Sequence, residues 1–455
     1  MITEVDKKIA AALNKGEEYW TFKEDAERDY VHGLFAYPAM MVPKMQREIL
    51  DVFDHQLAWS HTPTIYDPFM GSGTILVEGM LKGYNIVGVD INPLAYLVAK
   101  VKTEIYSLNR LRKSINVLFE RIKNTNDVEV ATDFDNIQKW FKPEIIRELD
   151  LIKQQIRLEP SLKFRRLMWV AFCDTVRLVS NARSCTYKLY IKTQKSIDNF
   201  DKSAIDMFYE CLESAYTGIA SFQQELQNKG FLKKNGRRIS YTGTISIYLA
   251  DTTRVSAHIC KQYAPDIAIT SPPYGDNETT VTYGQYSVLA LRWMDIQDIK
   301  KGIDGSIIES QSKIDRISLG GKIQKQLCAQ YRQELRNKAP TLEEQLTEIE
   351  QFDQNKTSKV ISFYHDFDEF VGSLNGLKSD SYVVMTVGNR TVAKQRIKMD
   401  KILQELFEFY DFDFSFEFSR RIINKRMSVV NAIDPETGTL LESMTKEYIL
   451  IMKKR

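Results

Sequence analysis

Short apolar stretches that end in polar or turn-forming residues recur along the chain and predict the strands of a sheet. The stretch 64–69 is followed by a glycine-rich turn, by apolar residues at helical spacing up to residue 83, and by a second apolar stretch at 84–93. This order predicts strand, helix, strand, and a parallel pair of strands needs such a helical crossover. We therefore expect an α/β fold. Later apolar stretches continue the pattern at 245–251, 266–270 and 381–389.

Two stretches near the C-terminus are richer in β-forming residues. Residues 410–421 alternate aromatic and polar side chains, and residues 446–454 form an apolar run, with turn-forming residues 434–438 between them. Such a pair predicts an antiparallel hairpin. The complete prediction is a Rossmann-like sheet, mostly parallel, that carries a C-terminal antiparallel hairpin.

Two insertions interrupt the predicted sheet. Apolar residues at three- and four-residue steps predict helices from residue 103 to about residue 238, whereas the segment from 298 to about 359 is more polar. Loops and insertions on a common scaffold carry function, so we expect the two insertions jointly to supply the contacts that recognise a substrate or partner. The expected division is 1–102 for the N-terminal segment and first half of the core, 103–240 for the helical insertion, 241–297 for the second part of the core, 298–360 for the polar insertion and 361–455 for the end of the core.

The composition is that of an ordinary globular protein, with 43% hydrophobic residues, 27% charged residues and a formal net charge of +2. This charge does not by itself indicate a nucleic-acid-binding protein, although a basic groove balanced by acidic residues elsewhere stays open. The five cysteines and five histidines show no metal-ligand spacing, which argues against metal or catalytic-triad chemistry. The N-terminus lacks an apolar signal core and no run is long enough to span a bilayer, so we expect a cytoplasmic protein.

The glycine-rich turn lies where a predicted strand ends and a helix begins. In DPFMGSGT, Gly71 and Gly73 let the backbone pass close beneath a ligand, and Asp67 places a carboxylate where it can face a cationic or amino-bearing group. No lysine follows as in a phosphate-binding loop, and the glycine spacing of dinucleotide-binding loops is absent. The turn therefore favours a ligand without phosphates.

Two further carboxylates end the next two predicted strands. Asp90 is well placed to take a ribose diol, and Asp251 ends the strand after it. Any one of the three carboxylates, taken singly, could equally cap a helix. Together with the glycine turn they favour a nucleoside that carries positive charge, which fits S-adenosylmethionine.

The sequence Ser271-Pro272-Pro273-Tyr274 stops the strand 266–270, because proline cannot donate to a sheet ladder. The Ser271 oxygen and the Pro272 carbonyl can accept the hydrogens of an exocyclic amine on a flat ring, while Tyr274 stacks on that ring. Accepting those hydrogens turns the nitrogen lone pair toward a sulfonium methyl, so positioning and electrostatics supply most of the catalysis. An isolated SPPY is often only a turn, but its place after the third carboxylate strand favours a function.

With these two motifs the sequence resembles the DNA amino-methyltransferases. DPFMGSGT is similar to their cofactor loop and TSPPY to their catalytic loop, while HGLFAYPAMMVPKM is similar to the segment that they place against the methionine end of the cofactor. VGNRTV (387–392) and RRIINKRM (420–427) resemble their later strand and hairpin regions. The carboxylate argument and the resemblance together imply these cofactor-binding residues: Tyr37, Pro38, Asp67, Pro68, Phe69, Gly71, Gly73, Thr74, Asp90, Ile91 and Asp251.

The serine form of the catalytic loop is typical of the cytosine-N4 branch of this family, whereas Asp or Asn is commoner in adenine-N6 enzymes. The resemblance therefore implies an S-adenosylmethionine-dependent DNA methyltransferase acting on cytosine N4, with adenine N6 as the near alternative. Two other interpretations stay open: a tRNA guanine-N2 methyltransferase, whose loop has Asp in place of Ser271, and a methyltransferase-like binding subunit without catalysis. Cytosine-C5 chemistry needs a thiolate nucleophile, and none of the cysteines follows a proline in a candidate loop.

Double-stranded DNA is the partner that the resemblance implies, with a cognate restriction endonuclease as a further candidate. A target amine inside a duplex is unreachable, so the base must be flipped against an aromatic wall. We expect Tyr274 to be that wall, whereas Tyr283 and Tyr286 fit half-buried helix residues better. Basic clusters are candidate phosphate contacts, although each alone is typical of a solvated face. They lie at 109–113, 163–166, 181–195, 233–238 and 420–426.

Overall fold

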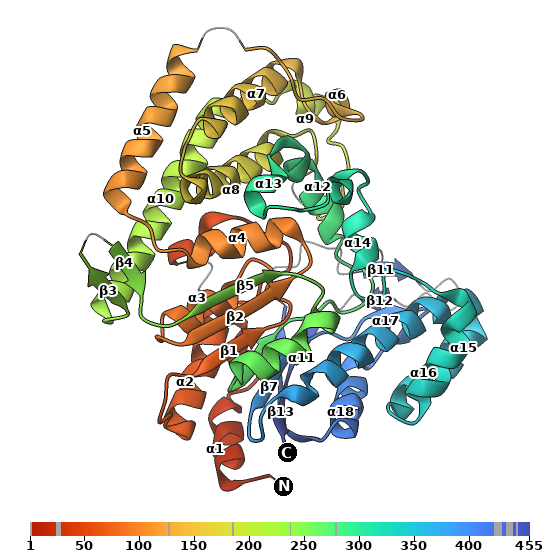
Figure 1. The fold of residues 1–455 in the computed structure, drawn as a ribbon. Helices are drawn as coiled ribbons and strands as arrows, with labels where there is room; N and C mark the ends of the chain where they lie inside the picture. Colours follow the sequence, from red (N-terminus) through yellow and green to blue (C-terminus); the bar gives the residue numbers. More distant parts are fainter. Residues whose placement is uncertain are drawn as a thin grey trace.

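The centre of the molecule is one mixed β-sheet. The computed structural model describes residues 2–23, 29–125, 128–183, 186–236, 238–277, 280–422, 430–433, 440–442 and 445–455. Among these residues, seven strands form a sheet in the order β10-β13-β7-β6-β1-β2-β5 (Figure 1). The strands are β1 (Thr64–Asp67), β2 (Asn85–Asp90), β5 (Ile245–Leu249), β6 (Ile267–Thr270), β7 (Tyr382–Val387), β10 (Phe412–Arg421) and β13 (Lys446–Lys454).

The strand directions confirm the predicted fold class. β5, β2, β1, β6 and β7 are parallel neighbours, and β13 runs antiparallel between β7 and β10. The chain fills one side of β1 first, with β2 and β5, and then the other side with β6 and β7. The sheet therefore has a topological switch point beside β1, which is where open α/β sheets bind ligands.

The C-terminal antiparallel pair is more elaborate than a simple hairpin. Between its strands, β11 (Val430–Ile433) and β12 (Leu440–Glu442) pair with each other and not with the large sheet. The predicted turn at 434–438 lies outside the described residues.

The central strands are buried on both faces. Successive residues of β1 point to opposite sides, so Ile65 packs into one hydrophobic core and Tyr66 into the other. Helices α2 (Pro43–Leu57), α3 (Thr74–Met80) and α4 (Pro93–Thr103) supply the first core, and α11 (Thr252–Tyr263), α17 (Gln354–Ser373) and α18 (Met399–Phe409) supply the second (Figure 1). Such double coverage explains why the predicted strands are nearly continuous apolar runs.

The predicted helical insertion forms a layer above α4 in Figure 1, where α8 packs on α4, α10 and α12. It contains α5 (Leu108–Asn124), α6 (Ile137–Trp140), α7 (Pro143–Arg157), α8 (Leu162–Val179), α9 (Gln194–Asp198) and α10 (Ala204–Asn228), followed by the small hairpin β3 (Leu232–Asn235) and β4 (Arg238–Tyr241).

The polar insertion is also largely helical. It contains η3 (Gly305–Ile308), α14 (Lys313–Ile317), η4 (Lys325–Leu327), α15 (Cys328–Arg336) and α16 (Pro340–Phe352). The next helix, α17, is continuous across residue 360, where the sequence suggested a domain boundary. The remaining elements are α1 (Glu4–Leu13), η1 (Tyr19–Thr21), η2 (Tyr30–Leu34), α12 (Tyr283–Trp293), α13 (Ile296–Ile299), η5 (Leu374–Gly376), β8 (Thr391–Val392) and β9 (Gln395–Arg396). In the part of the chain that the structure describes, we find no helix with the length and hydrophobicity of a bilayer span.

Candidate active site

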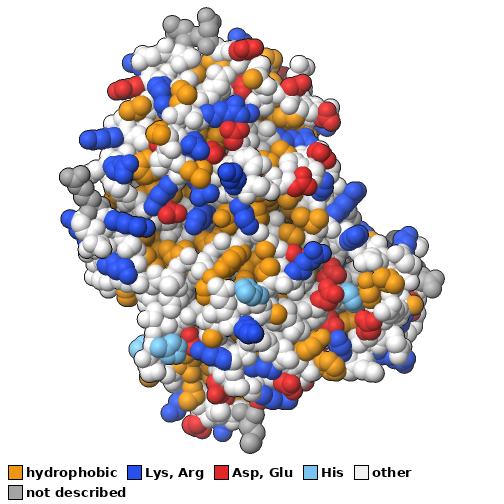
Figure 2. Space-filling model, viewed as in Figure 1, with side chains coloured by type: hydrophobic (Ala, Val, Ile, Leu, Met, Phe, Trp, Pro, Cys, Tyr) orange, Lys and Arg blue, Asp and Glu red, His pale blue; other side chains and the backbone are white. Residues whose placement is uncertain are grey.

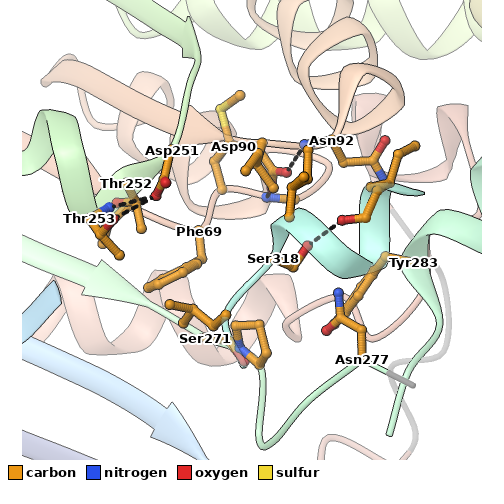
Figure 3. Close-up of a pocket in the computed structure, with 18 of the residues that line it drawn as sticks. Phe69, Asp90, Asn92, Asp251, Thr252, Thr253, Ser271, Asn277, Tyr283 and Ser318 are labelled. Carbon is orange, nitrogen blue, oxygen red and sulfur yellow. Dashed lines mark hydrogen bonds between the residues drawn. The ribbon is translucent and has the colours of Figure 1, made fainter. Parts of the chain in front are cut away.

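A cavity of about 560 Å³ lies at the carboxyl ends of β1, β2, β5 and β6, beside the switch point. Its wall combines segments that are far apart in the sequence, as Figure 3 shows for Phe69, Asp90, Asp251 and Ser271. The residues predicted from the sequence that line it are Tyr37, Pro38, Pro68, Phe69, Gly71, Thr74, Asp90, Ile91, Asp251, Ser271 and Pro273. Asp67, Gly73, Pro272 and Tyr274 are not among the lining residues.

The glycine turn has the conformation that the sequence suggested. Gly71 and Gly73 have φ of 48° and 78°, a region that residues with a Cβ seldom adopt, and Gly73 is the residue before α3. A Cβ on Gly73 would also lie 3.1 Å from the Cβ of Ala99 on α4. Tight packing of the turn against α4 thus brings the N-terminus of α3 to the cavity.

Asp90 connects the glycine turn to the end of β2. Its carboxylate accepts the backbone N–H groups of Gly71 at 2.9 Å and Asn92 at 2.8 Å. Burial nevertheless raises the pKa of Asp90 to about 6, because the charged form loses its water. The carboxylate lines the cavity (Figure 3) and keeps lone pairs for a ligand that offers hydroxyl donors.

Asp67 lies beneath the turn and has no exposed surface. One carboxylate oxygen accepts the Thr270 hydroxyl at 2.6 Å and the Phe69 N–H at 3.1 Å, which joins the ends of β1 and β6. The other oxygen has no hydrogen-bond partner within the described ranges. Burial raises the pKa of Asp67 to about 7. This carboxylate therefore supports the turn from below, one layer behind the cavity wall.

Asp251 caps a helix, which was one of the two roles that the sequence allowed for it. It is the residue before α11, and its side chain accepts the Thr253 N–H at 3.0 Å and the Thr253 hydroxyl at 2.8 Å (Figure 3). A second interaction, with Arg254 at 3.4 Å, uses the other oxygen. Asp251 still lines the cavity, so capping a helix and facing a ligand are both open to it.

The loop 271–274, which the sequence predicts to be catalytic, presents Ser271 and Pro273 to the cavity. The Tyr274 hydroxyl instead donates to Glu447 at 3.0 Å and contacts the Ser271 hydroxyl at 3.1 Å. The aromatic residues that line the cavity are Tyr37, Phe69 and Tyr283, the first residue of α12. Of these, Tyr283 is the one nearest in sequence to the loop at Ser271. It stacks on Tyr37 with ring centroids 5.8 Å apart (Figure 3 shows Tyr283). Tyr283 was expected to be only a half-buried helix residue; it is half-buried and also borders the cavity.

Sequence reasoning missed several residues of the cavity. Asn277 is buried in its wall, and its side-chain oxygen has no hydrogen-bond partner among the residues the structure describes. Asn92 also lines the cavity and donates its side-chain N–H to the Tyr37 hydroxyl at 3.0 Å. No local pattern marks either asparagine, although Asn277 lies only three residues after Tyr274, the end of the loop that the prolines identified.

The polar insertion forms a further part of the wall, which its sequence did not indicate. Asp315 accepts the Gly284 N–H at 2.8 Å, and the Gly320 N–H donates to Asp366 of α17 at 2.7 Å. These bonds fasten the insertion between α12 and α17. The wall residues that it supplies are Ile314, Arg316, Ile317, Ser318, Leu319, Lys322 and Gln324.

A cluster with possible metal ligands lies at the edge of this wall, where the sequence showed no ligand spacing. Single ligand atoms of His365, Asp366 and Glu369 lie within 4.8 Å of one another. Asp366 already accepts the Gly320 N–H, and the His365 ring stacks on Tyr331 with centroids 3.5 Å apart. Asp366 and His365 therefore already have partners within the protein.

The basic cluster at 163–166 has a structural role. Arg165 makes two bonds of 2.8 Å to the carboxylate of Asp298, and Arg166 donates to the carbonyl oxygens of Asp298 and Ile299. These arginines join the two insertions, so at least two donor atoms of each are directed at Asp298 or Ile299. Figure 2 shows Lys and Arg side chains interspersed with acidic and hydrophobic ones over the helical insertion on this face. Of the other clusters, residues 184, 185, 237 and 423–426 lie outside the described residues.

Comparisons with known proteins find similarity to methyltransferases. The family model described as UPF0020, RMKL-like, methyltransferase domain, matches residues 35–137. A solved structure, the rRNA methyltransferase aviRa from Streptomyces viridochromogenes, covers 94% of this chain and 92% of its own at 10% identity and a TM-score of 0.32, a score too low to bear on the fold.

Curated relatives extend the similarity over the whole chain. The Type II methyltransferase M.BsoBI of Geobacillus stearothermophilus is 27% identical over 63% of this chain and 58% of its own length. The Type II methyltransferase M.MvaI of Kocuria varians is 32% identical over 98% of this chain and 96% of its own length. This chain therefore belongs to the Type II DNA methyltransferases, as the two motifs around Gly71 and Ser271 had indicated.

Proposed function

We propose that the protein transfers a methyl group from S-adenosylmethionine to the exocyclic amine of a cytosine, at N4, in DNA. The observation that carries this proposal is that Ser271, the acceptor in the catalytic loop, borders the same cavity as Asp90 and the glycine turn. An amine held at Ser271 is then next to a ligand held by the turn. Methyl transfer needs that proximity.

The residues of the cavity fit S-adenosylmethionine. The volume of the cavity, about 560 Å³, is within the range for small-molecule sites. The backbone of the glycine turn packs closely against Tyr37 and leaves room for a ligand to approach it. Ser72 and Asn277 line it and each has a buried side-chain oxygen without a partner in the described part of the chain. Such oxygens favour a ligand rich in hydroxyl and amino groups.

When bound, S-adenosylmethionine supplies a methyl group on a positively charged sulfur. Asp90 would accept the ribose hydroxyls, since it faces the cavity from the end of β2. Asp67 places a carboxylate below the turn, where its negative form stabilises a cation above it. We assign the methionine end to the side of Tyr37 and Pro38.

The chain's own contribution to the reaction is orientation of the target amine. The Ser271 hydroxyl oxygen accepts an amine hydrogen, which directs the nitrogen lone pair to the methyl group. The Pro272 carbonyl, the second acceptor expected from the sequence, belongs to a residue that does not line the cavity. Tyr283 supplies an aromatic face at the cavity for the flipped base, because the Tyr274 ring does not line it. The serine in TSPPY favours cytosine N4 over adenine N6.

One incubation tests this proposal against its alternatives. Purified protein is incubated with methyl-labelled S-adenosylmethionine and mixed-sequence duplex DNA or tRNA, and the products are digested to nucleosides. We expect N4-methylcytosine from DNA. N6-methyladenine would establish the adenine alternative, N2-methylguanosine from tRNA the RNA alternative, and bound cofactor without any methylated nucleoside a non-catalytic binding subunit.

A further inference from the structure

The direction of β13 brings a glutamate to the catalytic loop. The parallel strands β6 and β7 end at the edge of the sheet that carries the cavity, whereas the antiparallel β13 begins there. Glu447 is the second residue of β13, and Tyr274 follows β6 by four residues. The two side chains therefore meet across the end of β7, although 173 residues separate them.

A buried arginine pairs with Glu447. Arg420, directly opposite on β10, donates from Nε at 2.8 Å and from Nη2 at 2.7 Å to one carboxylate oxygen, Oε2. The side chains of Arg420 and Glu447 are only 10% and 14% exposed. The other oxygen, Oε1, is the one that accepts the Tyr274 hydroxyl at 3.0 Å. Glu447 thus bridges the arginine to the catalytic loop.

The donors and acceptors in this series of hydrogen bonds fix the direction of each hydroxyl. A tyrosine hydroxyl has one hydrogen, and Tyr274 gives it to a carboxylate that can only accept. The 3.1 Å contact between Tyr274 and Ser271 must then be donated by Ser271. Among the described residues no other hydrogen bond of the Ser271 hydroxyl is present. Its hydrogen therefore points at Tyr274, and its lone pairs stay available to the cavity.

We propose that Glu447 is a positioning residue that, through Tyr274, sets the Ser271 hydroxyl as a hydrogen-bond acceptor for the target amine. The inference rests on the proposed function, in which Ser271 accepts a hydrogen of that amine. A freely rotating hydroxyl can also donate to the amine nitrogen, which would occupy the lone pair that attacks the methyl group. The relay from Glu447 excludes that competing orientation.

The loop is also held by contacts that do not involve Glu447. Asp276, two residues after Tyr274, pairs with Arg390 at 3.0 Å. Substitution of Glu447 by an isosteric residue should therefore change the hydroxyl directions more than the path of the backbone. This allows the relay to be tested separately from loop folding.

Glu447→Gln is the central variant of the test. The Gln oxygen is expected to face Arg420, which needs an acceptor, so the amide N–H faces Tyr274 and donates to it. The Tyr274 hydrogen then goes to Ser271, and the Ser271 hydrogen points into the cavity. We expect kcat to fall about 10- to 100-fold, the range for one charge-assisted hydrogen bond, with KM values for cofactor and DNA within about twofold.

Tyr274→Phe removes the hydroxyl and keeps the ring, so it should give a similar loss of kcat. Because the two residues act in series, the Glu447→Gln, Tyr274→Phe double variant should lose no more than either single variant. Glu17→Gln is the matched control, since Glu17 binds Ser419 and Lys446 on the same two strands without touching Tyr274. Its kcat should be unchanged.

Ser271→Ala separates failure of this inference from failure of the proposed function. Normal turnover of Ser271→Ala would contradict the acceptor role itself. Loss of turnover in Ser271→Ala, combined with normal kcat in Tyr274→Phe and in a folded Glu447→Gln, would overturn only the relay. If Glu447→Gln does not fold, Tyr274→Phe decides: a normal kcat overturns the relay and a 10-fold or larger loss at unchanged KM supports it.

Discussion

The backbone N–H of Gly71 donates to the carboxylate of Asp90 at 2.9 Å, and this bond joins the glycine turn after β1 to the end of β2. Two segments that the sequence marked for different reasons are thus one structural unit. The bond holds the turn over the cavity while the carboxylate remains at its wall. Binding of the cofactor and the shape of the turn should therefore depend on the same side chain.

Replacement of Asp90 by Ala should weaken cofactor binding. The variant loses both the proposed ribose acceptor and the acceptor of two backbone N–H groups. We expect the Kd for S-adenosylmethionine, measured by calorimetry, to rise about 10- to 100-fold, as for lost hydrogen bonds to a charged group. Asp304→Ala is the control, because Asp304 also accepts a backbone N–H, from Ser306 at 3.0 Å, but lies outside the cavity. Equal Kd values for both variants would contradict the role of Asp90.

Gly73→Ala should destabilise the protein more than an alanine at another left-handed glycine. The positive φ of Gly73 costs an alanine about 1–2 kcal/mol, and overpacking against Ala99 adds about 1–3 kcal/mol. Gly16 has φ of 85°, and a Cβ added there would meet nothing within 4 Å, so Gly16→Ala isolates the backbone cost. Denaturant unfolding compares the two, and a Gly73→Ala variant as stable as Gly16→Ala would show that the turn does not need its close approach to α4.

The pKa of Asp67 predicts a pH-dependent difference in stability. Burial raises it from 3.8 to about 7, so between these values the folded protein binds a proton that the unfolded chain has released. The contribution of this group to stability is therefore most favourable at low pH and falls as the pH rises toward 7. Asn has no such titration and can keep the bonds from Thr270 and Phe69.

The melting temperature of cofactor-free Asp67→Asn, relative to the unsubstituted protein, should therefore increase between pH 5 and pH 8. At pH 8 the Asp67→Asn variant should bind the positively charged cofactor more weakly than the unsubstituted protein does, because the variant lacks the negative carboxylate. A difference in melting temperature that is the same at both pH values would mean that Asp67 is ionised throughout this range.

Arg165→Ala should affect folding and not DNA affinity. Arg165 binds both carboxylate oxygens of Asp298 and so joins the two insertions. We expect a loss of about 1–3 kcal/mol in the free energy of unfolding, because Asp298 loses a bidentate partner. The slope of log affinity for DNA against log salt concentration should stay unchanged, whereas a residue that binds phosphate would reduce that slope by about one. A reduced slope would place Arg165 at the DNA.

The sheet and the two motif loops could be predicted because their signals are local. A buried strand such as β1 is an uninterrupted apolar run, and the turn at Gly71 and the loop at Ser271 follow such runs directly. Chain order alone then brings both loops to one edge of a parallel sheet. The residues that contact these loops could not be predicted in this way. The pairing of Tyr274 with Glu447 depends on the antiparallel direction of β13 and on its register, which no short window of sequence contains.

The two insertions illustrate the same limit. The cluster at 163–166 resembles a phosphate-binding patch until Asp298, more than 130 positions later, is seen to bind it. The wall formed by Arg316, Ser318 and Lys322 has no pattern of its own, because its position is set by Asp315 and Asp366 at its two ends. Contacts of this kind come from tertiary packing and become visible only in the folded chain.

Nucleoside analysis of methylated DNA tests the central claim most directly, when the protein is compared with its Ser271→Ala variant at equal occupancy by S-adenosylmethionine. The account predicts N4-methylcytosine from the unsubstituted protein and at least about a 100-fold lower yield from the variant, which keeps the cofactor but lacks the acceptor for the amine. Undiminished methylation by Ser271→Ala, or no methylated base from the unsubstituted protein with cofactor bound, would contradict it.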